Sequence, residues 1–174
     1  AYGIFGIHIR ALGTIQFSTL NTGSMYPLST AFSGQQRALT WGKNRVQVRD
    51  LESRDIEDVY QVLSTNGWAH RVPDVEYLRR IVEASQRSCV AIEGGKVVGF
   101  ARAITDGLSN GYLSMVVVAE PHRRQGVGKA LVKRIVDSDP QITWVLRAGW
   151  DGAREFFTAL GFSASSDTME RLRR

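Results

Sequence analysis

Residues 120–131, with the sequence EPHRRQGVGKAL, join an expected strand to an expected helix. The run before them, Tyr112 to Val118 (YLSMVVV), is apolar and rich in β-branched residues, as is typical of a buried strand. After the glycines, Val127, Leu131 and Ile135 follow helical spacing. A glycine-rich turn leaves the first N–H groups of a helix without partners, and the helix dipole adds partial positive charge there. The stretch therefore predicts an anion site, most naturally for phosphate.

Two nucleotide-binding motifs come close to this turn, but neither is matched. A Walker A loop needs glycine at position 123 and Ser or Thr at position 130, and these positions hold Arg123 and Ala130. A dinucleotide fingerprint needs a third glycine at position 131, which is Leu131, and a preceding βαβ unit, whereas the strands before the turn are expected to be antiparallel. Nucleoside-triphosphate hydrolysis and dinucleotide binding are therefore not expected.

Composition predicts one soluble globular domain. The chain has 174 residues, of which 43% are hydrophobic, and no apolar run approaches the roughly 18 residues of a membrane span. Residues 1–49 contain five Lys or Arg and no Asp or Glu, whereas from Asp50 onward 17 Lys or Arg balance 17 Asp or Glu. Because the domain itself is electroneutral, a general nucleic-acid surface is not expected.

Cysteine and histidine usage excludes several classes of protein. The single cysteine, Cys89, lies in an apolar run and is expected to be a small core residue, and it excludes an intrachain disulfide framework. His8, His70 and His122 are scattered without metal-ligand spacing, so no metal site is expected. The composition fits a reducing compartment, and we expect a cytoplasmic protein.

Residues 1–45 form a separate segment in the predicted domain organisation, and residues 46–174 form the domain. The segment is acid-free, basic and rich in Ser, Thr and Gly, which is typical of an organellar leader or a flexible arm. Gly23-Ser24-Met25 also resembles a cloning junction, so sequence added by cloning is a third alternative. If the segment is a targeting leader, the expected location changes from the cytoplasm to an organelle, the plastid.

Periodicity and turn residues predict the order of elements from residue 46 onward. A strand at 46–48 precedes a helix that Ser53 caps and Asn66-Gly67 ends, and Pro73-Asp74 opens a second helix. The expected later elements are strands at 88–92, 96–103 and 112–118, the helix after Gly126, a strand at 142–146, a helix at 152–160 that Gly161 ends, and short strands around Phe162 and at 168–172. This order predicts an α+β fold with a mixed, mainly antiparallel sheet that helices flank on both faces.

The turn also carries the pattern Arg-x-x-Gly-x-Gly, in Arg123, Gly126 and Gly128. It resembles the acetyl-CoA signature of the GCN5-related N-acetyltransferase (GNAT) family. Residues 153–162 (AREFFTALGF) are similar to the family's later helix-and-turn motif, and the expected order of elements agrees with its fold, so the resemblance spans residues 46–174. Residues 97–107 (VVGFARAITDG) are also similar to the plant and cyanobacterial small-amine branch that includes serotonin N-acetyltransferases.

The resemblance implies a site for acetyl-CoA (coenzyme A). Glycines in the turn allow backbone N–H groups to approach the pyrophosphate, and the strand before the turn would pair through its main chain with the pantetheine arm. The candidate cofactor-binding residues are Val116, Val117, Val118, Arg123, Arg124, Gln125, Gly126, Val127, Gly128, Lys129 and Phe157. For Lys133 and Arg134, which follow in the helix, a solvated face is the favoured interpretation.

Residues for acid–base catalysis are less clear. At the positions where many family members have an acidic base and a tyrosine acid, this chain has Met115 and Phe157, neither of which transfers a proton. Ser114 and Glu120 are candidates for ordering a water molecule, and His70 falls in a loop that borders the acceptor pocket in this fold. The general acid and base are therefore not identified.

The predicted function is direct acetyl transfer from acetyl-CoA to a primary amine, either a small amine or a peptide or protein amino group. The alternative is a catalytically degenerate acyl-CoA-binding module that regulates a partner. The neutral domain disfavours a third possibility, nucleic-acid binding through the basic segment and Arg123, Arg124, Lys129, Lys133 and Arg134. The expected partner is the acceptor, with a homodimer left open, and neither nucleic acid nor a membrane is expected.

Overall fold

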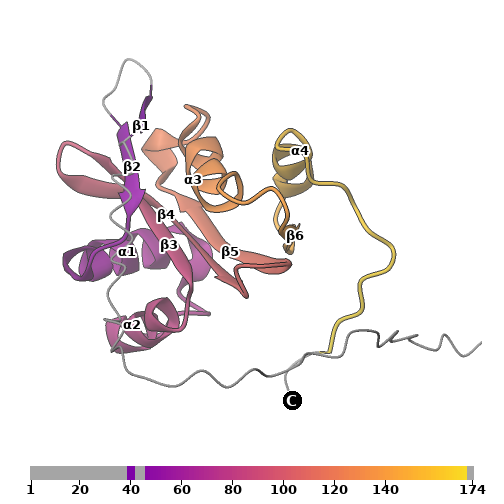
Figure 1. Cartoon of the computed structure of the whole chain (residues 1–174). Helices are drawn as coiled ribbons and strands as arrows, with labels where there is room; N and C mark the ends of the chain where they lie inside the picture. The colour runs from indigo at the N-terminus through magenta and orange to yellow at the C-terminus, as the bar shows by residue number, and fades with distance from the viewer. Residues whose placement is uncertain (1–38, 42–45, 172–174) are drawn as a thin grey trace, which may run out of the picture. The chain divides into compact units, whose positions relative to one another are not determined.

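The computed structural model describes residues 39–41 and 46–171 of the chain (Figure 1). Within these residues, one sheet contains six strands, whose order in the sheet is their order in the chain. The strands are β1 (Leu39–Trp41), β2 (Val46–Asp50), β3 (Arg87–Glu93), β4 (Lys96–Thr105), β5 (Asn110–Val118) and β6 (Thr143–Val145). Neighbouring strands are antiparallel except for β5 and β6, which are parallel. Apart from β1, the predicted segment 1–45 lies outside the described residues.

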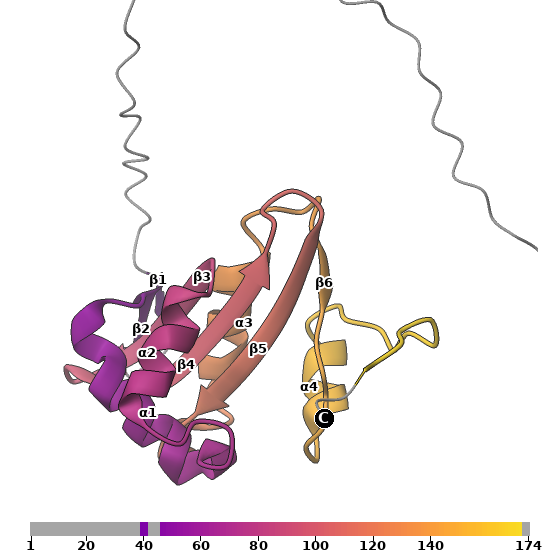
Figure 2. The same cartoon turned by 90° about the horizontal axis from the view of Figure 1, so that it is seen from below.

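Helices flank this sheet on both faces (Figures 1 and 2). The helices are α1 (Ile56–Leu63), α2 (Val75–Glu83), α3 (Val127–Val136) and α4 (Ala153–Thr158), with short turns η1 (Ser53–Asp55), η2 (Ser64–Trp68) and η3 (Glu120–His122). α1 and α2 pack on one face, and α3 and α4 pack on the other. The predicted α+β fold, with its mixed and mainly antiparallel sheet, is confirmed.

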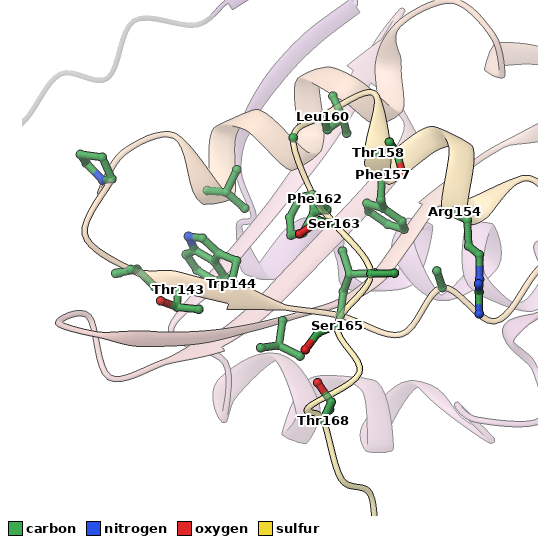
Figure 3. A pocket seen from close by; sticks show the side chains of 18 of the residues that line it. Thr143, Trp144, Arg154, Phe157, Thr158, Leu160, Phe162, Ser163, Ser165 and Thr168 are labelled. Atoms are coloured by element: carbon green, nitrogen blue, oxygen red, sulfur yellow. The ribbon is translucent and has the colours of Figure 1, made fainter.

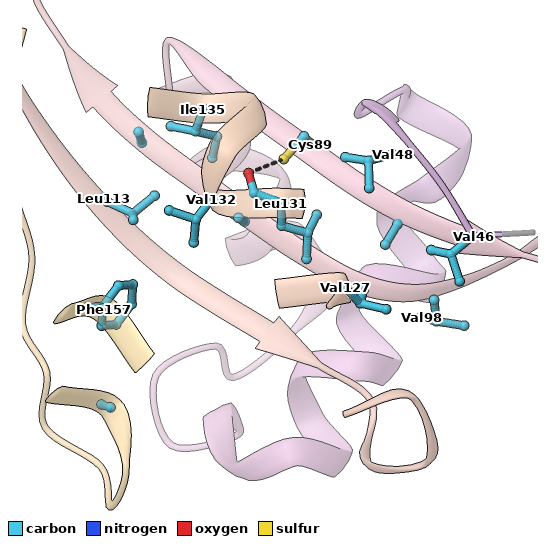
Figure 4. Close-up of a cluster of buried hydrophobic side chains, with 14 residues drawn as sticks. Val46, Val48, Cys89, Val98, Leu113, Val127, Leu131, Val132, Ile135 and Phe157 are labelled. Carbon is cyan, nitrogen blue, oxygen red and sulfur yellow. Dashed lines mark hydrogen bonds between the residues drawn. The ribbon is translucent and has the colours of Figure 1, made fainter. Parts of the chain in front are cut away.

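Side chains that alternate along the strands divide the core into two clusters. Val90 and Phe100 pack on one face against Leu63 of α1 and Leu78 of α2, and all four are fully buried. The opposite cluster, drawn in Figure 4, includes Cys89, Ala91, Leu113, Leu131, Ile135 and Phe157. Burial of a leucine or isoleucine side chain stabilises a fold by about 1.5–3 kcal/mol. The apolar side of α3 therefore fixes this helix against the centre of the sheet.

Several predicted turns form as expected. Gly94 and Gly95 connect β3 to β4 with φ angles of 56° and 81°, the left-handed values that a two-residue hairpin turn requires. Asp74 caps α2, because its Oδ1 accepts a hydrogen bond of 2.7 Å from the N–H of Tyr77. Gly161, with a φ of 90°, follows α4 and ends it.

The predicted cap of the first helix is wrong. Ser53 does not cap α1, because Ser53–Asp55 form the 3-10 turn η1 in front of it. Asp55, only 5% exposed, instead accepts a hydrogen bond of 2.8 Å from the N–H of Glu52 and two from the Arg49 guanidinium, of 2.6 and 2.8 Å. Hydrogen bonds to an ionised carboxylate are stronger than those to a serine hydroxyl, so Asp55 holds the segment before α1 in place of Ser53.

The strands predicted around Phe162 and at 168–172 are also wrong for the described residues, because 162–171 contain no strand. Most of this stretch consists of small or polar residues (SASSDTME at 163–170), and residues 163–171 are exposed. Without alternating apolar side chains, the segment has no face to bury against the sheet.

The Arg49–Asp55 pair makes stability depend on acid. Arg49 holds the pKa of Asp55 below its usual value, mainly through the hydrogen bonds between them and against the opposing effect of burial. The stabilisation is therefore present above the unfolded pKa of about 3.9 and is lost as the pH falls through the lower folded pKa. Asp55→Asn should lower the free energy of unfolding at pH 7 by about 1.5–3 kcal/mol, measured by urea unfolding.

Asp151→Asn is the control, because Asp151 is exposed and makes no ion pair with the described residues. It should change stability by less than about 0.5 kcal/mol. Asp55→Asn should also lose less stability than the parent chain between pH 4 and pH 2, roughly the range in which an Asp of lowered pKa titrates. Equal stability of parent and Asp55→Asn at pH 7 would contradict this account.

Candidate functional site

β5 and β6 diverge, and this divergence exposes a strand edge (Figure 2). They pair only between Asn110–Tyr112 and Thr143–Val145. Beyond Tyr112, the side of β5 that faces β6 has no strand partner among the described residues, along Leu113–Val118. Backbone N–H and C=O groups on such an edge can accept another extended chain as a partner.

A β-bulge lies in the middle of this open edge. Phe100 pairs with Val117 and Arg102 pairs with Ser114, so Met115 and Val116 together face a single residue of β4. Met115 has a φ of 52°, a left-handed value that is uncommon for a residue with a side chain. Such bulges bend a strand and occur often beside functional sites.

The turn after β5 leads directly to the N-terminus of α3. Arg124 and Gly126 adopt left-handed φ angles of 61° and 84°, and α3 begins at Val127 without a side-chain cap. The first intrahelical bond in the turn runs from the N–H of Ala130 to the carbonyl of Gly126, at 3.0 Å. The N–H groups of residues 127–129 have no hydrogen-bond partner among the described residues. The turn therefore offers unpaired donors together with the positive end of the helix dipole.

The basic side chains of the turn have different surroundings. Arg123 is held in place, because its Nε donates to the carbonyl of Val118 at 2.9 Å and its Nη2 donates to Oδ1 of Asn66 at 2.6 Å. Arg124 and Lys129 are exposed and make no bond with the described residues. Gln125 folds back onto the turn, with its Nε2 donating to the carbonyl of Pro121 at 2.8 Å. Of the predicted turn residues, Arg124 and Lys129 therefore have side-chain donors available for an anion.

The turn is also tied to the β3–β4 hairpin. Nε2 of His122 lies 2.8 Å from Oε2 of Glu93, and both side chains are about three-quarters buried. Together with the Arg123–Asn66 bond, this contact connects the turn to segments 29 and 57 residues earlier in the chain. Neither contact could be found by reading the sequence, because no periodicity links such distant residues.

Gly128 lies close to α4. A Cβ atom at this position would lie 3.2 Å from Cζ and 3.4 Å from Cε2 of Phe156. The first turn of α3 thus lies against an aromatic ring of α4, and this close contact favours a small residue at position 128. Sequence analysis missed Phe156, and only the neighbouring LGF motif drew attention to this helix.

The remaining predicted cofactor residues lie on two sides of the sheet. Val116 and Val118 are half-buried and pack toward α3 and α4, whereas Val117 is buried on the side of α1 and α2. Phe157 is only 5% exposed and lies in the core, where its ring makes edge contacts with Phe156 at 4.9 Å and Phe162 at 5.6 Å between centroids. The structure thus brings the valines and the turn together, with Phe157 in the packing behind them.

Two of the three candidate catalytic residues, Ser114 and Glu120, are not brought together. Ser114 lies in β5 beside the bulge, and Glu120 is exposed in η3 beyond the end of the strand. The four-residue step from Ser114 to Val118 alone spans about 13 Å of extended chain. His70 is exposed in the turn between η2 and α2 and makes no hydrogen bond or ion pair with the described residues. Ser114 is the candidate nearest to the bulge.

Cys89 lies in the core, as predicted, and burial raises the pKa of its thiol to about 12. Its Sγ lies 3.6 Å from the carbonyl oxygen of Leu131 (Figure 4). A thiol of this kind is almost wholly protonated at neutral pH and does not act as a nucleophile.

A cavity of about 770 Å³ lies elsewhere, between β6, α4 and residues 160–168 (Figure 3). Its walls include Trp144, Leu160 and Phe162, together with hydroxyl groups such as that of Thr158. Neither the open edge of β5 nor the turn before α3 contributes to it. The cavity is therefore separate from the open edge and the turn, although Phe157, one of the predicted cofactor residues, and Val145 of β6 line it.

Comparison with known proteins identifies the class to which this fold and site belong. Residues 48–162 match the sequence profile of the Acetyltransferase (GNAT) family. The match covers more than half of the chain, and the chain therefore belongs to this family. No curated protein sequence matches it.

Solved structures of the same fold come from several bacteria. A GNAT-family acetyltransferase from Streptococcus pneumoniae is 23% identical, with a TM-score of 0.64, 74% of this chain covered and 97% of that one. A protein from Xanthomonas campestris assigned to the same family is 27% identical, with a TM-score of 0.63 and coverages of 76% and 96%. A ribosomal-protein-alanine N-acetyltransferase from Brucella melitensis is 21% identical, with a TM-score of 0.57 and coverages of 74% and 98%.

The described residues contain neither a membrane-spanning helix nor a metal-binding cluster. No helix in the described part of the chain is long and apolar enough to cross a membrane. Across residues 39–41 and 46–171, no group of His, Cys, Asp or Glu side chains is arranged to hold a metal ion.

The contact between Gly128 and Phe156 can be tested by stability alone. Gly128→Val should destabilise the domain by about 1–3 kcal/mol, because the new methyl groups overlap the Phe156 ring. Phe156→Ala should remove this clash, so Gly128→Val should lower the free energy of unfolding clearly less in a chain that already carries Phe156→Ala. Urea unfolding of the parent, the two single variants and the double variant measures the coupling energy between the two positions. Gly149→Val is the control, since a Cβ at Gly149 meets nothing within 4 Å, and additive effects of the two changes would rule out the contact.

Proposed function

We propose that this chain is an acetyl-CoA-dependent N-acetyltransferase that transfers an acetyl group directly to a primary amine. One observation carries the proposal: the open edge of β5 continues into a turn that ends at the uncapped N-terminus of α3. Such an edge can bind an extended arm through its backbone, and such a turn can bind a phosphate group at the end of that arm. Acetyl-CoA combines these two parts in one molecule.

The residues present fit this donor substrate. The backbone of Leu113–Val118 offers amide groups to the pantetheine arm, and the N–H groups of residues 127–129 offer donors to the pyrophosphate. Arg124 and Lys129 add positive charge, and neither side chain is paired with another group in the described structure. Because most of these donors belong to the backbone, the site tolerates varied side chains along the strand.

The chemistry is a one-step acyl transfer. The neutral primary amine attacks the acetyl carbonyl carbon, so a C–N bond forms as the C–S bond of the thioester breaks. The amine proton passes to water, and the leaving thiolate takes a proton to give the free thiol. No covalent acyl-enzyme is involved, which agrees with the buried, protonated state of Cys89.

Positioning supplies most of the rate in this proposal. Met115 and Phe157 cannot transfer protons, and acid–base assistance contributes only about 10²–10⁴ in rate. Holding the amine against the thioester contributes more, since effective molarities of oriented groups reach about 10⁵ M and above. Within this scheme, the Ser114 hydroxyl beside the bulge orders the water that accepts the proton, whereas Glu120 lies toward the phosphate end.

The missing acid and base also favour a second function. An acyl-CoA-binding module that regulates a partner would keep the strand edge and the turn but would need neither side chain. The two functions differ in turnover: the module binds acetyl-CoA and releases no free thiol with any amine, whereas the enzyme releases one thiol for each amine acetylated.

Lys129→Glu tests the donor site. A glutamate in the first turn of α3 is favourable to the helix dipole, so the fold should be retained while the site loses a cation and gains an anion. Calorimetric titration should show acetyl-CoA binding weakened by about 10-fold or more. Lys133→Glu, with the same change in net charge on an exposed residue of the same helix, is the control and should stay within about 2-fold.

Two results would count against the proposal. Equal weakening by Lys129→Glu and Lys133→Glu would mean that charge acts at long range and not in the turn. No binding of acetyl-CoA to the unmutated chain would reject both the enzyme and the binding module.

Variants and alkylation of Cys89 test whether the acetyl group is transferred directly to the amine, without an acyl-enzyme. Because the pKa of its thiol is raised to about 12, native protein at pH 8 should resist alkylation by iodoacetamide, whereas protein in urea should react fully. Cys89→Ala should retain the rate of thiol release within about 2-fold, since no acyl group is carried on sulfur. Loss of activity in a correctly folded Cys89→Ala chain, together with burst kinetics in the parent, would indicate an acyl-enzyme instead.

A further inference from the structure

Arg102 is a half-buried cation at the centre of the sheet. It lies in β4, directly opposite Ser114 of β5, on the sheet face that carries α1 and α2. Its Nε lies 3.3 Å from Sδ of the bulge residue Met115, and its Nη1 donates to Oγ of Ser85 at 3.0 Å. The guanidinium therefore stands at the point where the open edge of β5 begins.

No carboxylate of the described residues pairs with Arg102. Its bonding partners are a thioether sulfur and a hydroxyl. The titratable neighbours that influence it are the Tyr112 phenol, then another cation, Arg71, and then Tyr77, and none of them is a carboxylate. Burial lowers the pKa of the Arg102 guanidinium, which means that its charge is poorly solvated. Half-buried guanidinium groups are normally paired with an anion, because an unpaired charge away from water is costly.

An apolar row of side chains adjoins Arg102 on the same face. Ile104 pairs with Tyr112, and Tyr112 pairs in turn with Val145, so the three stand side by side across β4, β5 and β6. Ile104 and Val145 are 45% and 42% exposed, although both are large and apolar. Since Arg102 and Ser114 form the next row toward the bulge, the face combines an uncovered apolar surface with an unpaired cation.

We propose that this face binds the acetyl acceptor, and that the acceptor is a small primary amine that also carries a carboxylate and an apolar side chain, as an amino acid does. Arg102 pairs with the carboxylate, and the row of Ile104, Tyr112 and Val145 contacts the apolar side chain. The amine then lies toward Ser114 and the bulge, where the open edge of β5 begins. This inference rests on the proposed acetyl transfer and names the substrate class of that same site.

Three probes of similar shape test this preference: phenylalanine, its neutral amide, and 2-phenylethylamine, which lacks the carboxylate. With acetyl-CoA as donor, kcat/KM from thiol release should be about 10-fold or more higher for phenylalanine than for either neutral probe. In Arg102→Gln this ratio should fall to about one or below, because kcat/KM for phenylalanine falls while the values for the two neutral probes stay the same. The KM for acetyl-CoA should not change, because Arg102 makes no contact with the turn before α3.

Two variants control for charge and for folding. Arg102→Lys keeps the charge but not the planar fork, so it should recover part of the preference for phenylalanine. Arg79→Gln removes a half-exposed guanidinium from α2 that pairs, among the described residues, with Glu76 alone, and it should leave the preference unchanged. If Arg102→Gln does not fold, the preference of the unmutated chain among the three probes still decides.

The outcomes separate this inference from the proposed function. Equal or faster acetylation of the amide or of 2-phenylethylamine by the unmutated chain would overturn the inference and leave amine acetylation standing. A preference for phenylalanine that survives in folded Arg102→Gln would overturn the role of Arg102. Acetyl-CoA binding without thiol release from any of the three probes would contradict the inference, and the proposed transfer would then be judged on a wider amine panel.

Discussion

The unpaired edge of β5 is the constraint on which the site depends. Gly111 and Trp144 hold β5 and β6 together at one end, where a Cβ on Gly111 would overlap the Trp144 ring. The same ring lies 5.3 Å from the Arg87 guanidinium, which also bonds to the carbonyl of Ile135 at 2.6 Å. Beyond this closed end the strands separate, and backbone groups that a sheet would normally pair are left open. A ligand that can act as a strand supplies the missing partner.

The bulge bends this edge, and the turn fixes how the edge connects to α3. At the bulge, Met115 and Val116 occupy the space of one residue, which bends β5 in the middle of the open edge. At the other end, the Arg123 side chain bonds to Val118 and Asn66 and fixes how the chain enters α3. Two chemically different regions therefore lie along one strand, a turn with unpaired N–H donors at its end and the Arg102 face near its beginning.

The sequence predicted the elements that depend on local signals. Gly94-Gly95, Pro73-Asp74 and Gly161 each mark a boundary because their backbone or side-chain chemistry acts within a few residues. The turn before α3 was predicted for the same reason, because a glycine-rich strand-to-helix connection is visible in twelve consecutive residues. The failed prediction of strands after Phe162 came from weak alternation in a polar segment, where no packing partner supported it.

Features that depend on contacts between distant residues could not be predicted. Gly128 was predicted from its place in the turn alone, and its close contact with Phe156, 28 residues later, is visible only in the structure. Arg102 passed unnoticed inside an apolar strand, because the sequence does not show that it faces Met115 and lacks a carboxylate partner. The sequence thus indicates where an anion binds, but the surroundings of a buried charge require the fold.

The most direct test of the account is backbone amide hydrogen exchange of the whole chain, with and without acetyl-CoA. If the open edge and the turn hold the donor, acetyl-CoA should slow exchange at alternate amides of residues 113–118 and at the amides of residues 127–129. Amides around the separate cavity, at residues 143–146 and 160–168, should be unaffected. Protection confined to that cavity, or no protection of β5 at saturating acetyl-CoA, would contradict the account.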